Sequence, residues 1–250
     1  MSKLSKLACG NIPQVAEGDL ARSLKHFATT LDLLEGYLRS PRRKRREADR
    51  LITPFVIRSI IEVACTSLIA RIDPFRVLSL ARVQQQATYD PSQKVASALQ
   101  WQGDVMSDGK STDLWVSSRK TTDMSRALLG DYQGEIFWQP AFLRLLDYVH
   151  ENELHELNEL APDLVKTEPS GLTPKFRGVA AKIYSAASKG VHHEFVLSIS
   201  SYYDDATLDQ LVEDTLDFIT DMALVANFSE TVKYRLTESR ALSIYRALQP

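Results

Sequence analysis

The segment from Lys182 to Glu194 carries the most distinctive set of polar and titratable side chains in the chain. Ser185, Lys189 and His192 follow one another at spacings of four and three residues, which places them on one face of a helix. Histidine is the side chain best suited to proton transfer near neutral pH. We therefore take these three residues as candidates for a catalytic site. A structural histidine bonded to a neighbouring helix is the alternative interpretation.

A glycine at position 190 lies inside this helical pattern. Glycine in a helix interior costs about 1 kcal/mol relative to alanine, so its presence calls for a reason. Either it permits the close approach of another part of the chain, or it ends the helix. In the second case His192 would lie at a helix C-terminus, where the helix dipole favours its cationic form.

A second candidate group lies on the apolar segment from Phe55 to Ile72. This segment is apolar around most of its circumference, which is typical of a central helix buried on several sides. Arg58 and Glu62 interrupt it four residues apart, and they are therefore neighbours on one helix face. We include both among the candidate catalytic residues. A small-molecule site in the bundle core would also use the nearby charges of Arg71, Asp73 and Arg76. A structural network of paired charges explains these residues more simply.

Six cations within nine residues form the strongest charge feature, and we predict that they contact RNA or another nucleic acid: Arg42, Arg43, Lys44, Arg45, Arg46 and Arg50. No aromatic residue is interleaved with them, as stacking on single strands would require. The alternative is a solvated loop that balances acidic surfaces elsewhere. Two such surfaces exist, one at 151–159 and one at 204–221, where seven acidic residues occur without a lysine or arginine between them.

Metal and cofactor motifs are absent from the sequence. His150 and His155 are five residues apart, which turns the second imidazole about 140° from the first and disfavours a helix-borne zinc site. Cys9 and Cys65 lack metal-ligand spacing. There is no P-loop, no G-x-G-x-x-G and no G-x-S-x-G motif. We therefore expect neither a metal nor a cofactor.

The elements that must position these residues are helices. Helical periodicity, proline breaks and caps predict an all-α, multi-helix bundle, with a loose arm at 1–17 and a single domain at 18–250 whose middle, 88–138, is irregular. A dipeptide of a capping residue and proline opens two of the helices, at Asp73 and Thr173, and Asp204 or Asp205 caps a third. The expected helices cover 20–38, 55–72, 74–86, 114–129, 140–160, 173–195, 204–225 and 230–248.

The bulk composition is that of a globular protein. The 250 residues include 44% hydrophobic and 25% charged residues, and the net charge is −2, which argues against a dedicated nucleic-acid coat. No window approaches 18 consecutive apolar residues, so we expect no membrane-spanning segment. Residues 1–10 lack the apolar region of a signal peptide. We expect a cytoplasmic protein.

The stretch Tyr184-x-x-x-Ser188-Lys-Gly-Val-His192 on a long amphipathic helix, followed by a helix with an acidic cap, resembles the HEPN-like helical bundles. The Arg58–Glu62 pair on a buried helix is similar to the polar core of such bundles. The resemblance covers Phe55–Ile72 and Phe176–Val225. It implies an HEPN-like protein of a prokaryotic defence or toxin–antitoxin module that associates with RNA or docks a partner.

Catalytic members of that family are ribonucleases in which four to six residues separate an arginine from a following histidine. The match by spacing in this chain runs from Arg144 to His150, and Leu145 stands where those members usually have a polar residue. The alternative function is a non-enzymatic helical subunit of a multiprotein complex or a homo-oligomer. The apolar stripe at 20–38 and the absence of a catalytic motif favour that alternative.

Overall fold

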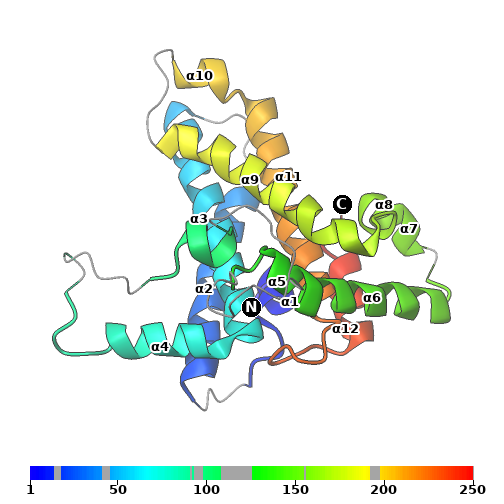
Figure 1. Cartoon of the computed structure of the whole chain (residues 1–250). Coiled ribbons are helices and arrows are strands. Elements are labelled where there is room, and N and C mark those ends of the chain that lie inside the picture. Colours follow the sequence, from blue (N-terminus) through cyan, green and yellow to red (C-terminus); the bar gives the residue numbers. More distant parts are fainter. Residues whose placement is uncertain are drawn as a thin grey trace, which may run out of the picture.

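The computed structural model is built from helices (Figure 1). In the part of the chain that it describes there is no strand, and one isolated bridge joins Gln102 and Met106. The predicted all-α class is therefore confirmed. His192 and four cations of the basic run, positions 42–45, lie outside the described residues. The described residues are 1–13, 18–40, 46–90, 92, 98–107, 126–154, 156–191 and 198–249.

The centre of the bundle is α3 (Glu47–Ile72), which contacts α2 (Asp19–Arg39), α9 (Leu172–Val191) and α11 (Asp205–Ala226). By length and composition α3 could cross a membrane, and 61% of its most apolar stretch is buried by the rest of the protein. Its apolar circumference matches the predicted central position. The helix begins at residue 47, before the predicted start at 55, and continues through Pro54.

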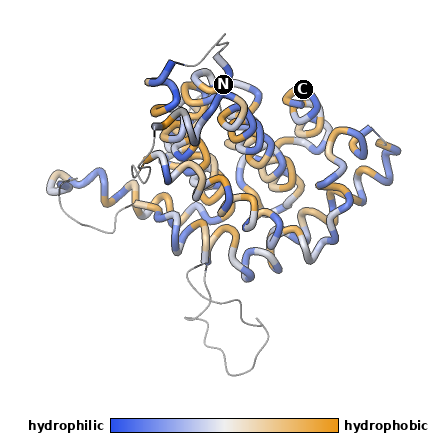
Figure 2. The backbone as a smooth tube through the Cα atoms, turned by 90° about the horizontal axis from the view of Figure 1, so that it is seen from above, coloured by the Kyte–Doolittle hydropathy of each residue, from blue (hydrophilic) through white to orange (hydrophobic). Residues whose placement is uncertain are grey.

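Each of the surrounding helices buries one apolar face. Seen from above, hydrophobic and hydrophilic positions alternate along these helices, as amphipathic packing requires (Figure 2). The predicted cap of α11 is present, since the Asp204 side chain accepts a hydrogen bond of 2.7 Å from the Thr207 N–H. The last helix, α12 (Glu238–Arg246), is shorter than predicted because Thr237 caps it and a non-helical loop precedes it.

The first residues correct the prediction of a loose arm. α1 (Lys3–Cys9) is a helix, and Leu4, Leu7, Ala8 and Cys9 have no exposed surface. It packs against α2, α3, α11 and α12. The physical reason is the spacing of its apolar residues, which pack into the core although Lys6 lies between them.

Arg71, at the end of α3, is fully buried and joins three parts of the chain. Its guanidinium donates to the carbonyls of Ala8 at 2.9 Å, Leu7 at 3.2 Å and Lys233 at 3.0 Å. It also donates to Asn227 Oδ1 at 2.8 Å. Burial lowers the pKa of Arg71 to about 10, so that the side chain remains a cation at neutral pH. This arginine therefore serves the structure.

Asp73 and Arg76, at the start of α4, also serve the structure, because they hold residues of the irregular middle of the chain. Asp73 precedes α4 (Pro74–Gln84) without capping it through its side chain, and it pairs with Arg126 at 2.5 Å instead. Arg76 pairs with Asp104 and donates to the Arg126 carbonyl at 2.8 Å. The helix predicted over 114–129 is wrong at 126–129, where the first two residues have no regular structure and the last two form a turn, and its remainder lies outside the described residues.

The helix predicted over 140–160 is divided in two. α6 (Gln139–Glu151) ends at a turn in which Glu153 has a φ of 53°, and α7 (Glu156–Leu160) follows. Edge-to-face contacts join Trp138 to Phe137 and to Phe176 of α9. The remaining short elements are α5 (Asp131–Gln133), η1 (Trp101–Val105), η3 (Gly134–Trp138), α8 (Pro162–Val165), η4 (Pro169–Gly171) and α10 (Ile199–Tyr202).

Gly190 permits the close approach of other parts of the chain to α9, which is one of the two roles predicted for it. It lies within α9, and a Cβ atom placed there would come to 3.0 Å from Pro54 of α3 and 3.0 Å from the ring of Tyr203. The Gly190 N–H also donates to the Tyr203 hydroxyl at 3.1 Å. The absence of a side chain therefore allows α9, α3 and α10 to meet at this point.

Candidate functional site

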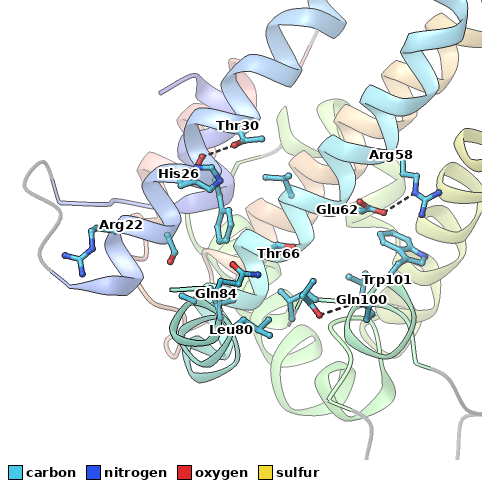
Figure 3. A pocket seen from close by; sticks show the side chains of 18 of the residues that line it. Arg22, His26, Thr30, Arg58, Glu62, Thr66, Leu80, Gln84, Gln100 and Trp101 are labelled. Atoms are coloured by element: carbon cyan, nitrogen blue, oxygen red, sulfur yellow. Dashed lines mark hydrogen bonds and ion pairs between the residues drawn. The ribbon is translucent and has the colours of Figure 1, made fainter. Parts of the chain in front are cut away.

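A large cavity lies between α2, α3, α4 and the segment at 98–105, with Tyr184 of α9 in its wall (Figure 3). Its volume is about 1040 Å³. Size and mixed chemistry make such a cavity the first candidate for a binding site. Its polar lining consists of Arg22, Ser23, His26, Thr30, Arg58, Glu62, Thr66, Gln84, Gln85, Gln100 and Gln102.

One wall of the cavity is a stacked group of side chains from three separate segments. Arg58 Nε donates to Glu62 Oε1 at 3.1 Å, as their spacing on α3 predicted. The Arg58 guanidinium carbon lies 4.6 Å from the centre of the Tyr184 ring. Tyr184 and Trp101 stack with their ring centres 4.1 Å apart and their planes 6° apart. The wall therefore presents a cation, a carboxylate and two aromatic rings together.

The electrostatics of this wall hold Tyr184 in its neutral form. Burial and the neighbouring Glu62 carboxylate raise the pKa of Tyr184 above its ordinary value, while Arg58 acts in the opposite direction. The phenol therefore stays protonated at neutral pH and remains a hydrogen-bond donor. A phenolate nucleophile or base is disfavoured at this site.

Trp101 is positioned by contacts outside the cavity. The Gln100 N–H donates to Asp104 Oδ2 at 2.7 Å, and Asp104 in turn pairs with Arg76 of α4. On its other side, the Asp104 carbonyl accepts from the Leu128 N–H at 2.8 Å. The Leu128 carbonyl accepts from Trp138 Nε1 at 2.7 Å. A chain of hydrogen bonds thus connects the core at Trp138 to the segment that carries Trp101.

The structure brings only some of the predicted catalytic residues together. Arg58 and Glu62 line the cavity, and α9 packs against α3. Ser185 and Lys189 are exposed on α9 and do not line the cavity. Tyr184 takes their place because the inward face of α9 is centred on its buried apolar residues: Phe176, Ala180, Ile183 and Ala187. His192 is not among the described residues.

The described part of the basic run engages this chain's own carboxylates. Arg46 Nε lies 3.5 Å from Asp49, one turn into α3. Arg50 pairs with Asp205 at the start of α11, at 3.2 Å. These two contacts agree with the alternative interpretation, in which the cations balance an acidic surface. The other members of the run, 42–45, lie outside the described residues.

Sequence reasoning missed Trp101 as a member of the site. An isolated tryptophan in a polar segment is a signal for a binding surface, but its partner could not be named without the fold. The Arg144–His150 match, in contrast, gives no site. Arg144 pairs with Glu230 and lies 3.4 Å from Glu238, so its guanidinium is already engaged by two carboxylates.

Among the residues that the structure describes, no three His, Cys, Asp or Glu side chains are grouped so as to hold a metal ion. Both cysteines are buried, and burial raises the pKa of Cys9 to about 11 and that of Cys65 further, so neither forms a reactive thiolate. Comparisons of the chain with protein-family models, with curated proteins and with solved structures give no match.

Proposed function

We propose that this protein binds single-stranded RNA and that the cavity beside α3 holds one of its nucleotides. The observation that carries the proposal is the stack of Arg58, Tyr184 and Trp101 on the cavity wall. Sequence-specific RNA recognition commonly relies on stacking of unpaired bases against aromatic rings and guanidinium planes. A base entering the cavity would extend this stack.

The remaining lining suits the other parts of a nucleotide. Gln84 and Gln85 from α4 and Gln100 and Gln102 from the 98–105 segment supply amide donors and acceptors, which are the groups that read base edges. Arg22 and His26 lie one turn apart on α2. The Arg22 side chain is 61% exposed and pairs with Asp19, and it would exchange that carboxylate for a phosphate. The cavity accordingly offers stacking, base contacts and a cation.

The proposal places this RNA-binding activity in a cytoplasmic, prokaryotic defence or toxin–antitoxin module, as the HEPN-like resemblance implies. It does not include hydrolysis. The described cavity lacks an arginine–histidine pair of the spacing found in catalytic members. Only three residues separate Arg22 from His26, where those members have four to six, and Arg58 is bound to Glu62. We therefore assign binding, and leave cleavage out of the proposed function.

Replacing Trp101 should weaken RNA binding. Loss of one stacked base costs about 1–3 kcal/mol, which corresponds to roughly 5- to 150-fold in affinity. We expect Trp101→Ala to show this loss in fluorescence anisotropy with a short, labelled, single-stranded RNA at fixed salt. Arg22→Ala should weaken binding less. It should also make the slope of log affinity against log salt concentration shallower by about one unit, the contribution of one phosphate contact. Intact RNA on a denaturing gel is expected throughout.

The matched control is Lys25→Ala, which removes an exposed cation of α2 that does not line the cavity. It should bind RNA as the unchanged protein does. A second control neutralises positions 42–46 and separates the cavity from the basic run. The proposal fails if the unchanged protein does not bind RNA, or if Trp101→Ala and Arg22→Ala both retain full affinity.

A second candidate function, the docking of a protein partner, is favoured by one surface. Three apolar side chains at the start of α3 are exposed, namely Leu51 at 37%, Ile52 at 45% and Phe55 at 41%. Tyr202 of α10, a helix that contacts α3, is 42% exposed as well. Neighbouring exposed apolar side chains of this kind mark interaction surfaces.

Replacement of this apolar surface should release a partner. We expect the unchanged protein to elute as a complex or homo-oligomer in size-exclusion chromatography with light scattering, together with its co-encoded proteins or with a second copy. The double variant Ile52→Ser/Phe55→Ser should elute as a monomer. An unchanged protein that is already monomeric and retains no co-encoded protein would contradict this candidate.

A further inference from the structure

A second cleft, separate from the RNA cavity, lies where the end of α2, the middle of α11 and the last residues of the described chain meet. Its volume is about 560 Å³. Four carboxylates and two cations line it: Glu35, Asp209, Glu213, Asp217, Lys3 and Arg39. The lining therefore carries more negative than positive charge, even with Lys3 and Arg39 counted.

The deepest carboxylate of the cleft is incompletely paired. Glu35 is only 6% exposed, and its Oε1 accepts a hydrogen bond of 2.8 Å from Arg39 Nε. Its other oxygen, Oε2, is buried and has no hydrogen-bond partner within the described part of the chain. A buried carboxylate oxygen without a donor is costly, and native proteins rarely leave one without a purpose. A cationic donor entering the cleft would satisfy it.

The wall opposite Glu35 is formed by carboxylates of α11. Asp209, Glu213 and Asp217 follow one another every four residues, about 6 Å apart along the helix axis. Burial, with the charges of Glu213 and Asp214, raises the pKa of Asp217. These carboxylates therefore repel one another, and a cation bound among them would relieve the repulsion.

Aliphatic side chains lie between the charged ones. Leu38 of α2, Val212 and Leu216 of α11, and Leu248 near the end of the chain complete the lining. The cleft thus alternates carboxylates with apolar surface. Hard divalent ions require a cage of several oxygen ligands, and the described residues do not form one. A ligand with ammonium groups separated by methylene chains matches both kinds of surface.

We propose that this cleft binds a small aliphatic di- or polyamine. One ammonium group would donate to Glu35 Oε2 and Glu213, a second would lie against Asp217, and the methylene groups between them would cover Leu38 and Leu216. The four-residue spacing of the α11 carboxylates is comparable to the separation of the two nitrogens across a four-carbon diamine. This site shares no residue with the RNA cavity, so each proposal is tested independently.

Isothermal titration calorimetry with 1,4-diaminobutane and with spermidine tests the site on the full chain. We expect saturable binding of spermidine with one site per chain, and weaker binding of the shorter diamine. Glu35→Gln should weaken spermidine binding at least tenfold because it removes the buried negative charge. Asp217→Asn removes a charge from the surface of the cleft and should weaken binding several-fold.

Glu151→Gln is the matched control, because it removes the same charge from an exposed position outside the cleft. It should leave spermidine binding unchanged. Titration of Mg²⁺ at equal ionic strength should give no saturable heat. The proposal is overturned if the unchanged protein does not bind spermidine. It is also overturned if Glu35→Gln and Asp217→Asn both bind spermidine as tightly as the unchanged protein, or if Glu151→Gln loses as much affinity as they do.

Discussion

Replacing Arg71 by leucine is expected to lower the free energy of unfolding by about 3–5 kcal/mol, the range found when one partner of a buried, charged hydrogen-bond network is removed. The variant would leave the carbonyls of Ala8 and Lys233 without this donor, whereas the Leu7 carbonyl keeps Asn227 Nδ2 and Asn227 Oδ1 keeps the Leu236 N–H. Each unsatisfied buried acceptor costs about 1–3 kcal/mol. Urea denaturation followed by circular dichroism measures the change.

The control for Arg71 is Arg240→Leu, which alters an exposed arginine of α12 and should change stability by less than about 0.5 kcal/mol. Arg71→Lys should be intermediate, because lysine keeps the charge but cannot present the planar fork of donors that reaches several carbonyls. Equal stability of Arg71→Leu and the unchanged protein would show that the network contributes nothing to the fold.

Replacing Trp138 by alanine should produce a loss of comparable size, about 3–5 kcal/mol, because it leaves a large cavity in the core. Trp138 has no exposed surface, meets Phe137 and Phe176 edge to face, and donates to the Leu128 carbonyl at 2.7 Å. The variant should also weaken RNA binding, because Leu128 holds the segment that carries Trp101. Denaturation and anisotropy measure the two effects.

Trp138→Phe separates packing from the hydrogen bond. It keeps most of the ring volume and removes the N–H donor, so its expected loss of stability is about 1–3 kcal/mol. RNA binding should still weaken, because the Leu128 carbonyl has lost its partner. If Trp138→Phe and Trp138→Ala both bind RNA as tightly as the unchanged protein, the hydrogen-bond chain from the core to Trp101 has no role in the site.

The sequence predicted the long helices because their periodicity extends over several turns. α2, α9 and α11 each repeat an apolar face, and α3 is apolar almost throughout. α1 was mistaken for a loose arm because seven residues give too few turns for periodicity to stand out. The early start of α3 was missed because a proline at position 54 usually marks the first turn of a helix, not its interior.

The sequence predicts only the part of the candidate site that lies on a single helix. Arg58 and Glu62 belong to one helix, and their pairing follows from a spacing of four. The sequence predicts Ser185 as a site residue and does not predict Tyr184. One position along a helix turns the side chain by about 100°, which decides which of the two meets α3. Trp101 belongs to an irregular segment, whose position depends on Arg76, Leu128 and other distant residues.

The bonds of Arg71 also bear on the kinetics of folding. They join positions separated by 64 residues at Leu7, 156 at Asn227 and 162 at Lys233. Closing such long loops slows folding, so the molecule should fold more slowly than bundles held by sequence-local contacts. During synthesis, α1 and α3 cannot complete their junction at Arg71 until residues near 230 have left the ribosome. Until then their apolar surfaces stay exposed and can bind chaperones.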